Sequence, residues 1–184
     1  MANTKITALD ALTVVAGEDL LAIVDDPTET AATKKIRVDD FQSTWHVGAR
    51  VYNSGNIAIS DNTQTFLTFD SERYDTDTIH DTSTNPGRLT ATTAGKYLIS
   101  ASIRFAADND GYRVFYLRVD GTTFIAIDSK QAVQSTTTEI TMQTIYDLAA
   151  THYVELAVYH LSGGSLDIVS AGNFSPEFMM HKIG

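Results

Sequence analysis

The clearest pattern in the chain is an alternation of apolar and polar side chains over residues 97–105. Successive side chains of a β-strand point to opposite faces of its sheet, so every second residue shares a face. One face is apolar and comprises Tyr97, Ile99, Ala101, Ile103 and Phe105. The other face is polar and includes Ser100, Ser102 and Arg104. This pattern predicts a half-buried strand of an antiparallel sheet.

Short apolar runs recur after Ala49 and are separated by turn-forming residues. The predicted strands are residues 65–69, 112–119, 123–127, 139–145, 153–160, 166–169 and 177–183. Asp120-Gly121 predicts a tight hairpin, because Asp and Gly accept the positive φ angles of a primed turn. No apolar pattern of helical period extends beyond about two turns, so we predict an all-β sandwich or barrel with very little helix.

Residues 1–45 read as a small separate module of short apolar pieces. They predict a hairpin with strands at Leu20–Asp26 and Lys34–Val38, joined by a turn at Pro27–Thr30. A lone hairpin is only marginally stable. We therefore expect the module to need a neighbour, which could be the main domain, a symmetry mate or a surface of a larger assembly.

The 184 residues suit one domain of ordinary size, residues 46–184, and the short module before it. Asp39 or Asp40 is predicted to cap a short helical turn near the boundary. No apolar run approaches the roughly 20 residues that span a bilayer, and the N-terminus lacks the apolar core of a secretory signal. We therefore expect a soluble protein with no membrane partner.

Composition excludes several kinds of site. The chain has no cysteine, which rules out a thiolate metal site and a thiol nucleophile. Its net charge of -10 disfavours nucleic acid as a partner. The histidines lack the spacing of a zinc motif, and we expect most of them at the surface or at sheet edges; they are His46, His80, His152, His160 and His181.

Two acidic stretches are candidate sites. Asp108–Gly111 has oxygen donors that suit calcium but lacks the remaining ligands of a calcium loop, so a plain loop is favoured. A second stretch contains Asp70, Glu72, Asp75, Asp77 and Asp81. Paired carboxylates roughly 5–10 Å apart can hydrolyse glycosides, but closeness in sequence does not establish such a pair.

A solvated loop, which could hold a cation or an arginine of a partner, is therefore favoured for the second acidic stretch. We expect Arg73 and Arg88 to pair with nearby carboxylates. No catalytic, cofactor-binding or metal-ligating constellation emerges, and we expect no enzymatic activity and no cofactor.

Residues 49–184 resemble the jelly-roll superfamily of the globular head of complement component one, subcomponent q, and of tumour necrosis factor. Four segments carry the resemblance: Arg88–Ile99, the hairpin Arg118–Thr122, Leu148–Leu156 and the closing Ser175–Gly184. The third segment departs from the family pattern, because Thr151-His152 replaces the usual Gly-Asp. The resemblance implies an antiparallel jelly-roll β-sandwich that assembles as a homotrimer.

Two N-terminal segments, Ile6–Leu9 and Gly17–Val24, resemble the N-terminal parts of bacteriophage tail-fibre and other virion appendage proteins. This resemblance implies a structural protein located in the virion, as a tail or head fibre or a capsid decoration. Residues 1–45 would attach it to a capsid or tail protein. The apolar residues expected to make this attachment are Leu20, Leu21, Ile23, Val24, Ile36 and Val38.

The family arrangement also implies a trimer interface. It assigns the strands of Tyr97, Tyr153, Tyr159 and Phe178 to the sheet that faces the threefold axis, with Met180 beside them. An apolar patch there would be buried by a closed oligomer. The alternative is that these residues fill the interior between the two sheets, and one sequence does not decide which face is which.

A different function remains open beside the structural one. Loops carried on a rigid sandwich are natural recognition surfaces, so the chain could be an adhesin or receptor-binding module for a host-surface glycan or protein. A glycan-cleaving enzyme is the least favoured hypothesis.

Overall fold

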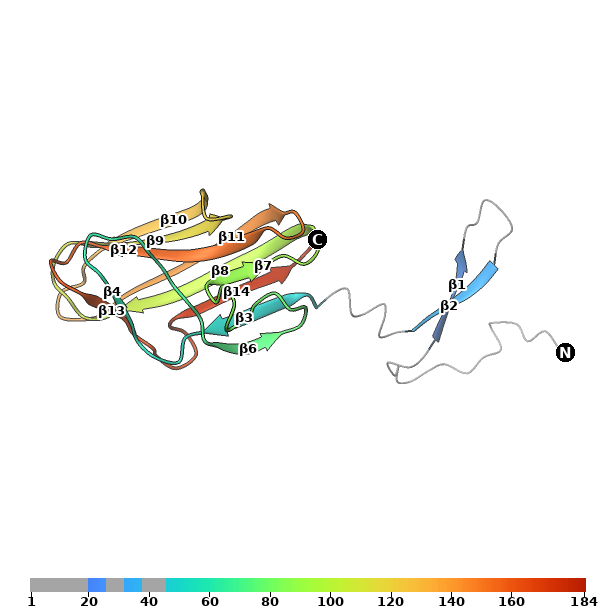
Figure 1. The fold of residues 1–184 in the computed structure, drawn as a ribbon, viewed down its shortest axis with the longest axis horizontal. Coiled ribbons are helices and arrows are strands. Elements are labelled where there is room, and N and C mark those ends of the chain that lie inside the picture. Colours follow the sequence, from blue (N-terminus) through green and yellow to red (C-terminus); the bar gives the residue numbers. More distant parts are fainter. Residues whose placement is uncertain (1–19, 26–31, 38–45) are drawn as a thin grey trace. The chain divides into compact units, whose positions relative to one another are not determined.

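The computed structural model describes residues 20–25, 32–37 and 46–184, and it divides the chain into two units, Met1–Trp45 and His46–Gly184 (Figure 1). In the first unit, β1 (Leu20–Asp25) pairs antiparallel with β2 (Ala32–Arg37). The predicted hairpin is confirmed, and its second strand begins earlier than expected. The predicted turn at Pro27–Thr30 and the predicted helical turn near Asp39 lie outside the described residues.

The second unit contains a sheet of five strands, all antiparallel. Its central strand β12 (Tyr153–His160) pairs on one side with β9 (Tyr112–Val119), which in turn pairs with β10 (Thr123–Gln131). On its other side, β12 pairs with two short strands, β5 (Thr65–Phe66) and β7 (Arg88–Thr90).

The other sheet has seven strands and is built around β8 (Gly95–Phe105). One edge of β8 pairs over its whole length with β11 (Thr138–Leu148). Its other edge pairs with β14 (Glu177–Lys182) and, at its end, with β13 (Leu166–Ile168). The remaining strands are β3 (Gly48–Tyr52), β4 (Ile57–Ile59) and β6 (Ser71–Asp75). The predicted antiparallel all-β sandwich is confirmed, and the described residues contain no helix, so none that could cross a membrane.

The core fills the space between the two sheets (Figure 1). The alternation predicted for β8 is confirmed, because Tyr97, Ile99 and Phe105 are fully buried whereas Leu98 is exposed. The facing sheet contributes buried side chains such as Phe115 and Leu156. Full burial of side chains of this size stabilises the fold by roughly 1.5–3 kcal/mol each.

The turn between β9 and β10 has the predicted geometry. Asp120 and Gly121 have φ angles of 51° and 66°, the left-handed values that a primed two-residue turn requires. Gly111 has a φ of 68°, and a Cβ atom there would lie 1.4 Å from the carbonyl oxygen of Leu161. A glycine is therefore required where the loop before β9 passes the end of β12.

One expectation about polar residues is wrong. Residues 71–75, assigned to an acidic loop, form the edge strand β6, which pairs with β3. Most of β6 is exposed on both faces, so it lacks the alternation that marks a half-buried strand. The histidines His46, His152 and His181 are outside the core, as expected for most of them, whereas His80 and His160 are buried. His160 is accommodated because its ring nitrogens face Ser162 Oγ at 3.0 Å and the Ile59 carbonyl oxygen at 3.1 Å.

A buried carboxylate joins three strands of the seven-stranded sheet. The side chain of Glu177 is 2% exposed and lies between Arg50 and Arg73. Arg50 Nε donates to Oε2 at 2.8 Å, and Arg73 Nη2 donates to Oε1 at 2.8 Å. The same guanidinium groups donate to the carbonyl oxygens of Asn173 and Gly172. This cluster therefore fixes β3, β6 and β14 to the loop that precedes β14.

We predict that Glu177→Gln lowers the free energy of unfolding by about 2–3 kcal/mol, because the amide removes a buried charge and points a donor at an arginine. Glu139→Gln is the matched control, since Glu139 also pairs with an arginine, Arg104, but is 53% exposed. The control should cost less than about 1 kcal/mol. Urea unfolding followed by far-ultraviolet circular dichroism measures the free energy of unfolding of both variants. Equal decreases in the two variants would contradict the structural role of Glu177.

Candidate functional site

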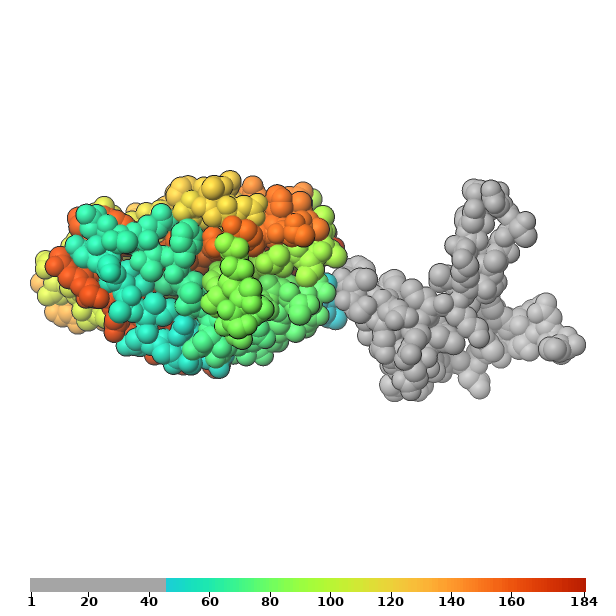
Figure 2. All heavy atoms as spheres, in the orientation of Figure 1, coloured from blue at the N-terminus to red at the C-terminus, as the bar shows by residue number. Residues whose placement is uncertain are grey.

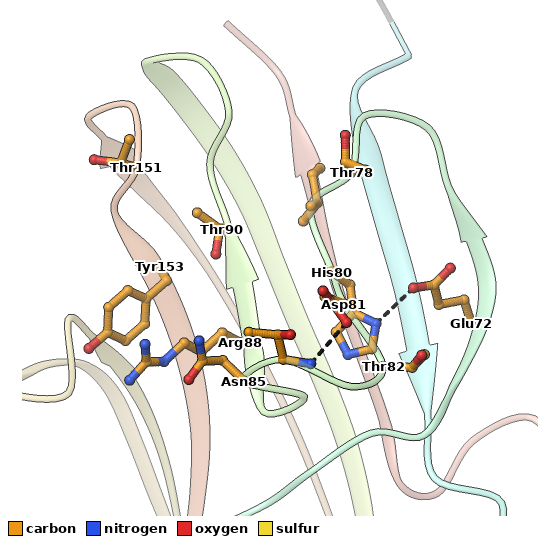
Figure 3. Close-up of a pocket in the computed structure, with 12 residues that line it drawn as sticks. Glu72, Thr78, His80, Asp81, Thr82, Asn85, Arg88, Thr90, Thr151 and Tyr153 are labelled. Carbon is orange, nitrogen blue, oxygen red and sulfur yellow. Dashed lines mark hydrogen bonds and ion pairs between the residues drawn. The ribbon is translucent and has the colours of Figure 1, made fainter.

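A surface hollow of about 690 Å³ lies where β6, β7 and the start of β12 come together (Figure 3). The segment that connects β6 to β7 forms much of its wall and lies at the surface of the second unit, green in Figure 2. The lining is mainly polar and consists of Glu72, Thr78, Ile79, His80, Asp81, Thr82, Thr84, Asn85, Arg88, Thr90, Thr151 and Tyr153.

The β6–β7 segment is held by its own carboxylates. Asp75 accepts hydrogen bonds from the backbone N–H of Asp77 at 3.0 Å and of His80 at 2.8 Å. Asp81 Oδ1 accepts from the backbone N–H of Ser83 at 2.8 Å and of Thr84 at 2.9 Å. Side chains that bond to backbone amides in this way replace the ladder bonds that a loop lacks, so they define its shape.

Further contacts attach the segment to the sandwich. The imidazole of His80 bridges β6 and the loop, with Nδ1 2.9 Å from Glu72 Oε1 and Nε2 3.1 Å from the carbonyl oxygen of Pro86. The backbone N–H of Thr90 donates to the carbonyl of Ile79 at 2.8 Å. The wall of the hollow is therefore connected to strands of both sheets.

Two wall residues have left-handed backbone conformations. Thr78 has a φ of 53° and Asn85 a φ of 56°. Asn accepts this region readily, whereas it is unusual for a β-branched residue such as Thr. Thr78 therefore keeps this conformation because the surrounding hydrogen bonds impose it.

The opposite wall is formed by an arginine stacked on a tyrosine. The guanidinium carbon of Arg88 lies 3.9 Å from the centre of the Tyr153 ring. Its Nε atom donates to Glu155 Oε1 at 2.9 Å, and the Glu155 side chain is only 12% exposed. The stacking and the ion pair together hold the guanidinium in one orientation beside the hollow (Figure 3).

The acidic residues considered as catalytic candidates have structural partners. Glu72 contacts His80, Asp70 accepts from Ser54, and Asp77 accepts from Thr92. The predicted pairing of Arg73 and Arg88 with carboxylates is confirmed, although both partners, Glu177 and Glu155, lie far away in the sequence.

The Asp108–Gly111 stretch is a loop, and its first carboxylate has a partner. Asp108 Oδ1 accepts from the backbone N–H of Asp110 and from the fully buried Arg113, both at 2.9 Å. No group of three or more candidate metal ligands occurs among the residues that the structure describes.

The residues predicted to form a trimer interface do not share a surface, and the prediction is wrong for three of them. Tyr97, Phe178 and Met180 are 0% exposed and lie in the core of a single subunit. Tyr153 and Tyr159 belong to β12, in the other sheet. The alternation pattern shows which residues share a face of a sheet, but it does not show which face packs against the other sheet. Here the apolar face of β8 and β14 points toward the other sheet.

Other apolar side chains occupy the outer face of the seven-stranded sheet. Leu98 and Ile145 lie directly opposite each other on β8 and β11 and are 38% and 57% exposed. Their neighbours on this face are polar or charged and include Ser100, Gln143 and the paired Lys96 and Asp147. Sequence reasoning missed these two residues because each is a single apolar residue on an otherwise polar face.

The outer face of the five-stranded sheet is aromatic. Tyr116 packs on the exposed Phe124 at 5.4 Å, and Tyr112 packs on Tyr159 at 5.9 Å. Desolvation by these neighbours raises the pKa of Tyr116 and of Tyr159. The exposed Ile127 lies opposite Tyr116 on the neighbouring strand.

The sequence matches no protein-family model and no curated protein. The fold is similar to that of Eiger TNF from S. frugiperda, with a TM-score of 0.56 and 14% identity, over 76% of this chain and 93% of that chain. It is also similar to murine APRIL, with a TM-score of 0.57 and 9% identity, over 75% of this chain and 99% of that one. The second unit is therefore a jelly roll of the tumour necrosis factor type, as the sequence predicted. At these low sequence identities, the similarity shows the fold and nothing about function.

The Asp81 carboxylate allows a test of the hollow's frame. Its hydrogen bonds from Thr84 and Ser83 lower the pKa of Asp81 from 3.8 to about 2. Because the folded value is depressed, the stabilisation by ionised Asp81 is complete above the unfolded pKa and disappears as the pH falls through the folded pKa. We predict that Asp81→Asn lowers the melting temperature at pH 6, and that the difference from the wild type shrinks between pH 4 and pH 2.

Asp147→Asn serves as the control, since Asp147 is 73% exposed and only approaches Lys96, at 4.0 Å. Calorimetric melting across this pH range should show almost no change for the control. An Asp81→Asn deficit that persists undiminished at pH 2 would contradict the assignment.

Proposed function

We propose that this protein is a structural component of a bacteriophage particle, a homotrimeric fibre or capsid decoration located in the virion. The observation that supports the proposal most is the combination, in one chain, of a tumour necrosis factor-type jelly roll and a separate hairpin unit. The resemblance of Gly17–Val24 to virion appendage proteins supports the same function for the hairpin. In this proposal the jelly roll is the projecting head, and residues 1–45 attach it to a capsid or tail protein.

The trimer would use the outer face of the seven-stranded sheet, which the family arrangement directs toward the threefold axis. Leu98 and Ile145 provide its exposed apolar side chains, and Met179 lies beside Ser100 on the same face. A closed symmetric assembly would remove these side chains from water without leaving a free copy of the surface.

The attachment proposal rests on the hairpin's size. Strands β1 and β2 form a two-stranded sheet with six residues in each strand. A hairpin of this kind is only marginally stable alone, and both of its outer edges have backbone groups that can pair with another chain. Docking on a capsid or tail protein would supply the missing partner.

A second candidate function is receptor binding, and the hollow beside Arg88 and Tyr153 favours it. Its wall is a loop held on a rigid sandwich, which is a common arrangement for recognition surfaces. Recognition of a host-surface molecule there is compatible with a structural function of the same particle component.

We predict that Ile145→Asp weakens the trimer, raising its dissociation constant at least about tenfold, since a buried unpaired carboxylate costs more than ~1.4 kcal/mol. Ile127→Asp is a matched control, because Ile127 is 58% exposed and Ile145 57%, but Ile127 lies on the other sheet. Size-exclusion chromatography with light scattering at several concentrations measures the assembly. A wild-type monomer, or dissociation by Ile127→Asp alone, would contradict the proposed interface.

We predict that Ile23→Asp reduces incorporation of the full-length protein into particles, because it places a charge in the strand that is proposed to dock. The variant should leave the jelly roll folded. An unchanged β-sheet circular dichroism spectrum of the full-length protein would report this. Incorporation is measured by complementing a phage that lacks the protein and quantifying it in purified particles. Normal incorporation of both Ile23→Asp and a chain without residues 1–45 would refute the attachment.

A further inference from the structure

The hollow contains polar groups that the subunit leaves unused. Within residues 46–184, the side-chain hydroxyls of Thr78, Thr82, Thr90 and Thr151 form no hydrogen bond with another residue. The side-chain amide of Asn85 is likewise free of such bonds in this range. These groups come from separate parts of the sequence and line the same hollow, so a bound molecule could contact several of them.

Unlike the threonine and asparagine side chains, the charged side chains of the hollow already have partners within the subunit. Glu72 contacts His80, Asp81 accepts from Ser83 and Thr84, and Arg88 contacts Glu155. Only the terminal nitrogens of Arg88 remain for a ligand, and stacking on Tyr153 holds them in place. The groups available for binding are therefore hydroxyls, one amide and a preoriented guanidinium.

This set of groups fits a molecule with many hydroxyls. Threonine hydroxyls both donate and accept, the Asn85 amide does both through separate atoms, and Arg88 donates. A volume of about 690 Å³ is within the usual range of small-molecule sites. We propose that the hollow binds a neutral oligosaccharide.

Charge decides between neutral and acidic sugars. The carboxylates in and around the hollow, Glu72, Asp81 and Glu155, outnumber the cationic groups even when His80 carries a proton. The chain as a whole has a net charge of -10, which repels anions at longer range. Sialylated or uronic acid-containing glycans are therefore disfavoured.

The frame of the hollow is preorganised, so binding requires little reordering. The bonds made by Asp75 and Asp81 hold the loop, and Thr78 and Asn85 have left-handed conformations within it. A site with this rigidity loses less conformational entropy on binding than a mobile loop would lose. Trimerisation would present three copies, which raises the avidity for a surface that displays many glycans.

The test is a glycan array printed with neutral oligosaccharides of hexoses and N-acetylhexosamines and with sialylated and uronic oligosaccharides, probed with the full-length protein. We expect binding to neutral members and none to acidic ones. Calorimetric titration with the strongest neutral oligosaccharide then compares variants. Absence of neutral binding, or a preference for acidic glycans, overturns the inference.

Two variants locate the site. Asn85→Gly removes the amide but suits the φ of 56°, and we expect about tenfold weaker binding. Thr84→Trp should abolish binding, because its indole would occupy the hollow. The matched controls are Ser135→Gly, at a φ of 61° outside the hollow, and Thr136→Trp on the same distant loop, and both should bind normally. Unchanged binding by Asn85→Gly and Thr84→Trp overturns the inference.

This inference rests on the second proposed function. Its failure is distinguishable from failure of the structural function, because particle incorporation and trimer formation are measured without a glycan. A protein that assembles into particles but binds no sugar would retain the structural proposal and lose only the binding site. Melting temperatures of the variants confirm that any loss of binding is not a loss of folding.

Discussion

The fold depends on β8 being paired along both edges while one of its faces is fully buried. Its hydrogen bonds to β11 extend from Gly95 to Phe105, and β14 and β13 complete the other edge. The five side chains that alternate inward provide the middle of the core. A shift of register by one residue would turn every one of them outward, so pairing and burial determine each other. The rest of the sandwich is arranged around this strand.

Much of this architecture was predictable, because the long strands are half-buried and therefore alternate. Strand β8, the Asp120-Gly121 turn and the absence of helix from residues 46–184 all follow from local patterns. Strand β6 was not predictable, because it is an edge strand whose side chains are mostly in water. The pattern also could not identify the inner face, and Tyr97 and Phe178 were therefore as compatible with an interface as with the core.

The candidate site was predictable only in part. Glu72, Asp81 and Arg88 are recognisable in the sequence as charged residues, but in the structure they mainly build the frame of the hollow. The uncharged polar side chains of its lining are threonines and an asparagine from three separate segments. Residues of these types are common on any solvent-facing strand or turn, so only the three-dimensional arrangement distinguishes them.

The separation of frame and lining has a consequence for how the protein can change. The loop shape comes from Asp75, Asp81 and His80, whose side chains form hydrogen bonds with backbone atoms of the loop. Thr82 and Thr90 take no part in those side-chain contacts. Their replacement would alter what the cavity accepts while the polypeptide path stays the same. Point mutations in the lining would therefore change the surface of the hollow while the scaffold stays intact.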